Sequence, residues 1–128
     1  MPFDRNVSGG WVVGTNLFKL DEVLSYYSPR LGRTFTAQPD FITDFSSVPR
    51  IAWTALGVLP TSYQVRRAGV THDMLYRSGI VIRTLADQLF YDMIREEGLG
   101  YIRSQLCWQA LRMFGGTNYK GVTVWTTS

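Results

Sequence analysis

The residues best suited to acid–base chemistry surround His72, the only histidine of the chain. Imidazole is the side chain whose ordinary pKa lies near neutrality, and a carboxylate that orients the ring can make it a general base. Asp73 follows His72 directly, and Asp87 lies further along the chain. The sequence therefore predicts a site centred on His72 with a carboxylate as its partner.

Two predicted helices position these residues. Apolar or small residues recur at spacings of three and four over 63–77 and again over 83–97, which is typical of amphipathic helices. Ser78-Gly79 and Gly98 supply the helix stops. A connection as short as this one makes antiparallel neighbours, so we expect a helical hairpin.

The hairpin sets the heights of the two side chains. His72 lies eight residues before Ile80, and Asp87 lies seven residues after it. At about 1.5 Å of rise per residue, both side chains reach nearly the same level. We therefore expect a hydrogen bond between His72 and Asp87 across the hairpin.

Helical spacing separates the roles of the two carboxylates. Tyr76 lies at i+4 from His72 on the same face, whereas Asp73 is turned by about 100° toward an adjoining edge. Tyr91 stands at i+4 from Asp87. Asp87 would orient the imidazole, and Asp73 would be free to hold a cation.

These residues resemble a known enzyme family. The run from His72 to Arg77, read as His-Asp-x-x-Tyr-Arg, and the run from Asp87 to Met93, read as Asp-x-x-Phe-Tyr-Asp-Met, are similar to the core of secreted phospholipase A2, above all its small prokaryotic branch. The resemblance implies that His72 takes a proton from water and that Asp87 fixes its tautomer. It further implies that Tyr76 and Tyr91 steady Asp87.

The same resemblance implies a calcium ion. Asp73 would be one ligand of Ca²⁺, which takes about 6 to 8 oxygens. The chain lacks the disulfides and the glycine-rich calcium loop of the secreted enzymes. The best substitute for this loop is the segment 39–49 with Asp40 and Asp44, and Asp44 is the candidate for a further ligand. The alternative for this segment is purely structural, with Ser47 as the N-cap of a short helix that runs to Leu56.

A second resemblance covers most of residues 21–114. Thr43-Asp44-Phe45-Ser46-Ser47-Val48-Pro49-Arg50, followed by the run from His72 to Arg77, is similar to a family of short proteins from bacteriophages and prophages. This resemblance implies a phage gene. It does not imply an activity.

The composition predicts one α+β domain. The chain has 128 residues, 45% of them hydrophobic, which suffices for a single core. We expect a β-rich part over 1–45, a helical part over 46–116 and a C-terminal strand or tail over 117–128. Three main helices would lie beside a small antiparallel sheet built from the N-terminal third and a strand over 121–126.

The predicted strands and the third main helix complete this outline. β-branched and aromatic residues favour strands over 11–13, 17–27 and 33–41. The helix is predicted over 101–114, and we expect these residues to face inward: Ile102, Leu106, Ala110, Met113 and Phe114.

Arginine dominates the positive charge. The net charge is +3, with eleven arginines and two lysines. Guanidinium groups suit phosphate and carboxylate ligands, so Arg50, Arg77 and Arg83 are predicted to bind an anionic substrate. Solvated faces and salt bridges between subunits are the alternative, and no motif for sequence-specific nucleic-acid binding organises the arginines.

The chain carries no predicted export or membrane signal. The N-terminus lacks the basic start and apolar run of a signal peptide, and no segment has the roughly 18 apolar residues that span a bilayer. One cysteine excludes an internal disulfide framework and the cysteine-rich zinc motifs. We expect synthesis in the cytoplasm of the host. Later incorporation into a virion would leave no mark in the sequence.

Two classes of function follow. The first is a phage-encoded hydrolase similar to phospholipase A2, acting on a phospholipid or related anionic ester and used in the virion or at lysis. The second is a non-catalytic virion structural or assembly protein of the tail, neck or capsid that binds other virion proteins or itself. In that case His72 and Asp87 are a satisfied polar pair within the hairpin.

Overall fold

The fold is that of a computed structural model, which describes residues 3, 7–15, 17–43, 48, 50–56 and 63–114. Within these ranges, five strands precede four helices: β1 (Gly9–Trp11), β2 (Phe18–Leu20), β3 (Leu24–Ser28), β4 (Arg33–Ala37), β5 (Ile42–Thr43), α1 (Arg50–Leu56), α2 (Tyr63–Ser78), α3 (Arg83–Glu96) and α4 (Tyr101–Phe114). The predicted α+β class with three long helices is confirmed. The strand expected over 121–126 and the N-cap at Ser47 lie outside the described residues.

The strands form two small antiparallel sheets instead of the single one expected. One sheet has the order β1-β2-β5, and the other pairs β3 with β4. The run predicted over 17–27 is broken because the chain bends at Asp21-Glu22. The run over 33–41 ends in a turn in which the Phe41 N–H donates to the Gln38 carbonyl and Asp40 has φ of 72°.

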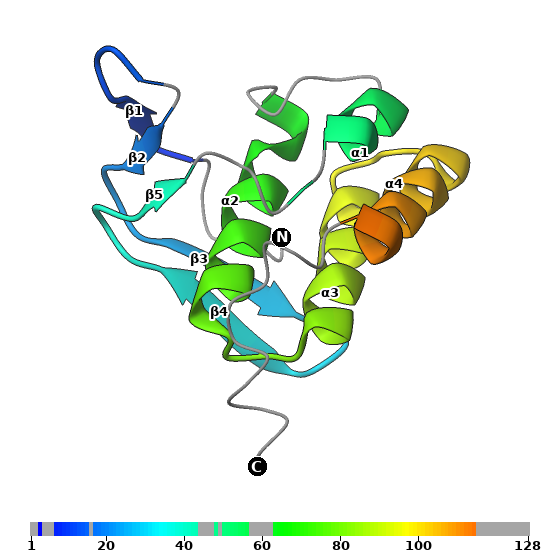
Figure 1. The fold of residues 1–128 in the computed structure, drawn as a ribbon. Helices are drawn as coiled ribbons and strands as arrows, with labels where there is room; N and C mark the ends of the chain where they lie inside the picture. Colours follow the sequence, from blue (N-terminus) through cyan, green and yellow to red (C-terminus); the bar gives the residue numbers. More distant parts are fainter. Residues whose placement is uncertain are drawn as a thin grey trace.

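Helix α2 lies at the centre of the molecule, between the sheets on one side and α3 on the other (Figure 1). Its residues are buried almost without interruption from 65 to 76. The face predicted to be apolar is buried, but so are Thr71 and Asp73, which lie on the two adjoining edges of the helix. Because partners cover α2 from two directions, a charged side chain on it such as Asp73 needs partners inside the protein.

The hairpin of α2 and α3 forms where the glycine stop predicts it. Gly79 adopts φ of 65°, a conformation that glycine takes without the penalty of a Cβ atom, and its N–H donates to the Leu75 carbonyl at 3.1 Å. Helix α3 then begins at Arg83 and buries these residues: Ala86, Asp87, Leu89, Phe90, Met93 and Ile94. Asp87 is thus the one charged residue on the inward face of α3.

Helix α4 has the predicted bounds but not the predicted orientation. Its buried residues are Ser104, Cys107, Ala110 and Leu111. Ile102 and Met113, expected to face inward, are 73% and 71% exposed, and Leu106 and Phe114 are about half exposed. The physical reason is that α4 packs against both α1 and α3 through the side with smaller residues, which permits close helix approach.

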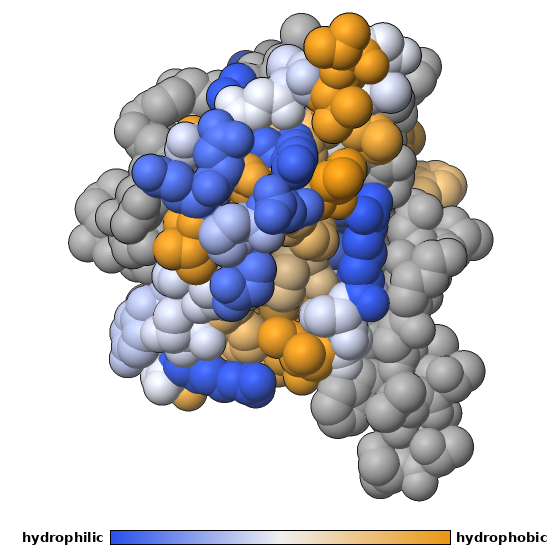
Figure 2. Space-filling model, turned by 90° about the vertical axis from the view of Figure 1, so that its left-hand side faces the viewer, coloured by the Kyte–Doolittle hydropathy of each residue, from blue (hydrophilic) through white to orange (hydrophobic). Residues whose placement is uncertain are grey.

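Both hydrophilic and hydrophobic residues reach the surface on the side that carries the sheets (Figure 2). A groove of about 540 Å³ lies there, between the 38–41 turn and the end of α2.

None of the helices in the described parts of the chain is long and apolar enough to cross a membrane.

Candidate functional site

The His72 ring contacts Asp87 across the hairpin, as the offsets from the turn predict. The distance from His72 Nε2 to Asp87 Oδ1 is 2.9 Å. Both side chains are fully buried. The ring is packed by Tyr76, with centroids 4.3 Å apart, and by Phe90, with centroids 5.0 Å apart, so these two aromatic side chains hold the imidazole in one orientation.

Tyr76 shares the same carboxylate oxygen. Its hydroxyl donates to Asp87 Oδ1 at 2.5 Å. Because Tyr76 lies one helical turn after His72, one face of α2 presents both donors to one acceptor on α3. The predicted grouping of His72, Tyr76 and Asp87 is therefore present in the structure.

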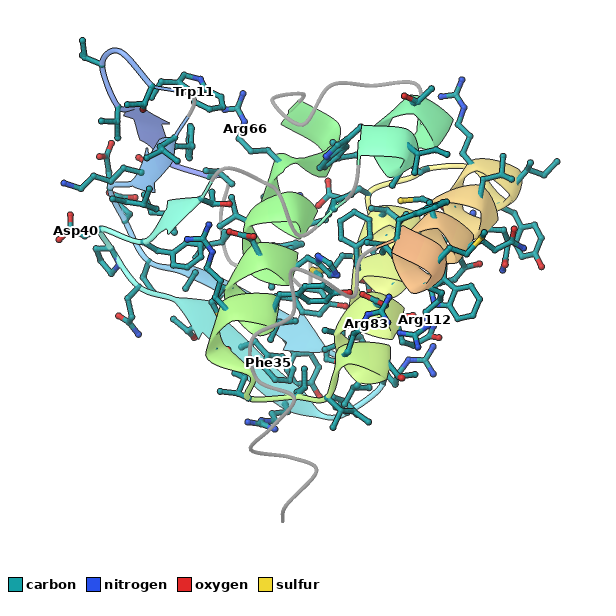
Figure 3. The ribbon with its side chains drawn as sticks, viewed as in Figure 1. Trp11, Phe35, Asp40, Arg66, Arg83 and Arg112 are labelled. Atoms are coloured by element: carbon teal, nitrogen blue, oxygen red, sulfur yellow. The ribbon has the colours of Figure 1, made fainter. Side chains whose placement is uncertain are left out.

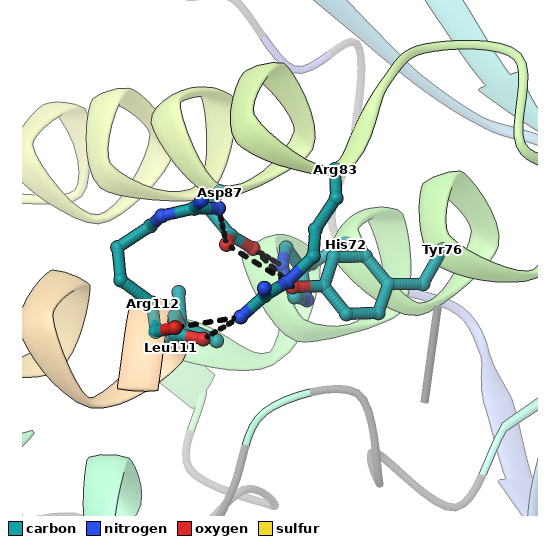
Figure 4. A network of polar contacts seen from close by, with 6 residues as sticks. All are labelled: His72, Tyr76, Arg83, Asp87, Leu111 and Arg112. Atoms are coloured by element: carbon teal, nitrogen blue, oxygen red, sulfur yellow. Dashed lines mark hydrogen bonds and ion pairs between the residues drawn. The ribbon is translucent and has the colours of Figure 1, made fainter. Parts of the chain in front are cut away.

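Two arginines complete the environment of Asp87 (Figures 3 and 4). Arg112 Nη1 from α4 lies 2.8 Å from Asp87 Oδ2, and Arg83 Nε lies 3.8 Å from the same oxygen. Arg83 Nε also contacts the Tyr76 hydroxyl at 3.3 Å. The carboxylate thus receives two donors from α2 on one oxygen and faces positive charge from α3 and α4 on the other.

Arg83 also ties the end of α4 to the site. Its Nη2 donates to the carbonyls of Leu111 and Arg112 at 2.7 and 2.9 Å. These carbonyls belong to the last turn of α4, where carbonyl groups lack partners within the helix and attract cations. Arg83, predicted to bind substrate, therefore serves in this structure as a link between α3 and α4.

The sequence interpretation missed Arg112, although counting residues from the connection between α3 and α4 indicates its position. Asp87 lies twelve residues before Leu99, in the connection between α3 and α4, and Arg112 lies thirteen residues after it. The same comparison that pairs His72 with Asp87 places Arg112 beside Asp87 from the third helix. Arg83 carried a second signal, because it lies at i−4 from Asp87 on the same helix.

These contacts fix the ionisation of Asp87 and Tyr76. Burial alone would raise the pKa of the Asp87 carboxyl, but hydrogen bonds from His72, Tyr76 and Arg112, together with the His72 charge, outweigh it and lower the pKa. Burial, followed by the charge of Asp87 and the hydrogen bond to it, raises the pKa of the Tyr76 hydroxyl. Asp87 is therefore ionised at neutral pH, and Tyr76 keeps its proton and donates it.

An ionised Asp87 selects one tautomer of the neutral ring. Since the carboxylate only accepts, His72 Nε2 must carry the hydrogen, and Nδ1 then carries the lone pair of the imidazole. This arrangement can support a general base, with Asp87 stabilising the imidazolium that forms. A thiolate nucleophile is unsuited to the same region, because burial raises the pKa of Cys107 to about 12.

Asp73, the predicted metal ligand, is buried and already bound within the protein. Its Oδ2 accepts a hydrogen bond from Thr43 Oγ1 at 2.7 Å and lies 3.2 Å from Arg77 Nε. Asp44, the other predicted ligand, lies outside the described residues. Among the residues that the structure describes, no three His, Cys, Asp or Glu side chains form a cluster able to hold a metal.

Two other predicted site residues, Tyr91 and Arg77, contact residues outside the dyad of His72 and Asp87. The Tyr91 hydroxyl accepts from Gln105 Nε2 at 3.2 Å instead of donating to Asp87. Arg77 is bound to Asp73 and donates to the Ile42 carbonyl at 2.7 Å. The side chain of Arg50 is not among those described.

Comparison with known proteins identifies a family. No curated protein and no solved structure is similar enough to the chain to count as a match. A family described as "protein of unknown function (DUF1353)" matches residues 18–111, a range that includes His72, Tyr76 and Asp87. Since this match extends over more than half of the sequence, the chain belongs to the DUF1353 family.

Proposed function

We propose that this protein is an ester hydrolase, similar to phospholipase A2, in which His72 activates water. The observation that carries the proposal is the 2.9 Å contact between His72 Nε2 and the ionised Asp87, reinforced by Tyr76 on the same oxygen. Enzymes that use general-base catalysis often use an imidazole oriented in this way. The resemblance of the two runs from His72 and Asp87 to the phospholipase core supports the choice of an ester as substrate.

The proposed reaction uses the ring as a proton carrier. His72 Nδ1 takes a proton from water while the water oxygen forms a bond to the ester carbonyl carbon. The tetrahedral intermediate then breaks its bond to the alcohol oxygen, which receives the proton from His72, so that a carboxylic acid and an alcohol leave. Asp87 holds the ring and stabilises the transient imidazolium throughout.

The burial of the dyad sets a condition on this proposal. Because His72 is fully buried, water and an ester reach Nδ1 only when the surrounding residues open. Calcium, the proposed cofactor, would have to compete with Arg77 and Thr43 for the carboxylate of Asp73. Asp73 would supply one of the roughly 6 to 8 oxygens that the ion needs, and no step above depends on the ion.

The second candidate is a non-catalytic component of a phage particle. Two observations favour it. His72 is completely buried, and Asp87 is paired with both Arg83 and Arg112. In this reading the polar network fixes the packing of α2, α3 and α4, because each buried polar group needs its partner. The resemblance of the Thr43–Arg50 run to phage and prophage proteins supports a phage gene for both candidates.

Hydrolysis of mixed phospholipid vesicles, with and without Ca²⁺, separates the two candidates. An enzyme should lose at least about 10²-fold of its rate in His72→Gln, which cannot act as a base at neutral pH. Asp92→Asn, on α3 but paired with Arg30 and not with His72, is the matched control and should keep the rate. An inactive wild-type protein across all headgroups would refute the hydrolase and leave the particle component.

A further inference from the structure

A small pocket between α3 and α4 is lined by two amides and two aromatic side chains. Its volume is about 160 Å³, and its lining residues are Gln88, Tyr91, Gln105 and Trp108. Each helix contributes an amide and an aromatic residue three positions apart, which places both on the same face. The pocket lies one helical turn from the dyad network, since Tyr91 follows Asp87 by four residues and Trp108 precedes Arg112 by four.

The hydrogen-bonding groups of the pocket are only partly used. Gln105 Nε2 donates to the Tyr91 hydroxyl at 3.2 Å, which leaves the phenol proton and the Gln105 carbonyl oxygen for a ligand. The indole N–H of Trp108 is buried and has no acceptor among the described residues. Buried donors are normally paired, so an acceptor from a ligand would satisfy this N–H, which a ligand in the pocket reaches when the indole ring shifts toward it.

The lining of the pocket suits a neutral ligand better than an ion. None of the four lining side chains is charged. Asp92, a carboxylate that contacts one of them, accepts from Gln88 Nε2 at 3.4 Å and is paired with Arg30 at 2.8 Å. A ligand therefore has to be neutral and has to offer both donors and acceptors beside an apolar face.

We propose that this pocket binds a single sugar ring, free or as one unit of a glycan. The C–H faces of a pyranose suit the electron-rich faces of Trp108 and Tyr91, and its hydroxyls can donate to and accept from the two amides. The volume accommodates one ring and not a chain of several. The site is independent of the proposed hydrolase, because none of its lining residues belongs to the dyad.

The indole N–H signal of Trp108 in a ¹⁵N-labelled sample tests the proposal, with Trp108→Phe identifying the signal. Glucose and N-acetylglucosamine, added up to about 50 mM, should each shift it in a saturable way, with Kd on the order of millimolar for so small a ligand. Trimers of the same sugars should bind at the same site if a glycan is the source. Gln105→Leu should weaken binding at least about tenfold, whereas Gln109→Leu on the exposed side of α4 should leave it unchanged.

Three results would overturn the proposal. The first is the absence of a Trp108 shift with every sugar in the folded wild-type protein. The second is an equal Kd in Gln105→Leu, with folding of that variant checked by its melting curve. The third is a shift produced by an oligoproline peptide and not by sugars, which would assign the aromatic pair to a peptide instead.

Discussion

Replacement of Asp87 by asparagine removes one charge from the centre of the network while keeping the shape of the side chain. In the native protein Asp87 faces His72, Tyr76, Arg83 and Arg112 and is fully buried. Removing one partner of a buried ion pair costs about 3–5 kcal/mol. Arg83 and Arg112 are 25% and 29% exposed, so water can partly solvate them, and we expect a loss of about 3 kcal/mol in the free energy of unfolding.

The pH dependence of the stability difference is a second, independent test of this prediction. The pKa of Asp87 is lowered in the folded protein relative to about 3.9 in an unfolded chain. A lowered pKa contributes stability that is present above the unfolded value and is lost as pH falls through the folded value. The difference in stability between wild type and Asp87→Asn should therefore be full at pH 7 and should shrink below about pH 4.

Urea unfolding of both proteins between pH 3 and pH 7 measures the effect, and Asp92→Asn serves as the control on the same helix. Asp92 is 16% exposed and both its oxygens accept from Arg30, which is 48% exposed, so its replacement removes the partner of a well-solvated guanidinium and should cost about 1 kcal/mol. A loss below about 1 kcal/mol in Asp87→Asn at pH 7, or a difference that does not narrow in acid, would refute the reasoning.

Two further predictions concern α4 and the cation. Leu111→Ala should lose about 2–5 kcal/mol because Leu111 is fully buried, whereas Leu106→Ala, about half exposed on the same helix, should stay within about 0.5 kcal/mol; equal losses in urea unfolding would contradict the observed orientation of α4. If Asp73 binds calcium, millimolar Ca²⁺ should raise the melting temperature of the wild type and not of Asp73→Asn, and a melting curve insensitive to calcium in both would rule out this ligand.

The hairpin and its dyad were predictable because both rest on local signals. Gly79 marks the end of α2, and the nearly equal offsets from the turn bring His72 and Asp87 to one level. Position along a helix converts directly into height, so a contact between adjacent antiparallel helices follows from counting residues. The same arithmetic would have placed Arg112 at Asp87 once α4 was recognised as the third antiparallel neighbour.

The orientation of α4 and the division of the sheet depend on tertiary packing. Apolar residues occur on two sides of α4, and periodicity alone does not say which side meets α1 and α3. The environment of Asp73 was not predictable for the same reason. Its position beside His72 suggested a carboxylate available to bind a cation. Its actual environment depends on Thr43, which reaches it from β5, a strand distant in sequence.

The state of the His72 ring tests the central claim most directly, namely that Asp87 fixes an oriented base. His72 is the only histidine, so a ¹⁵N-detected spectrum of the ring has one imidazole to interpret. At a pH where the ring is neutral, we predict a protonated Nε2 and a lone pair on Nδ1, with this preference lost in Asp87→Asn. A wild-type ring with its proton on Nδ1 would contradict the account, because Nε2 could then not donate to Asp87.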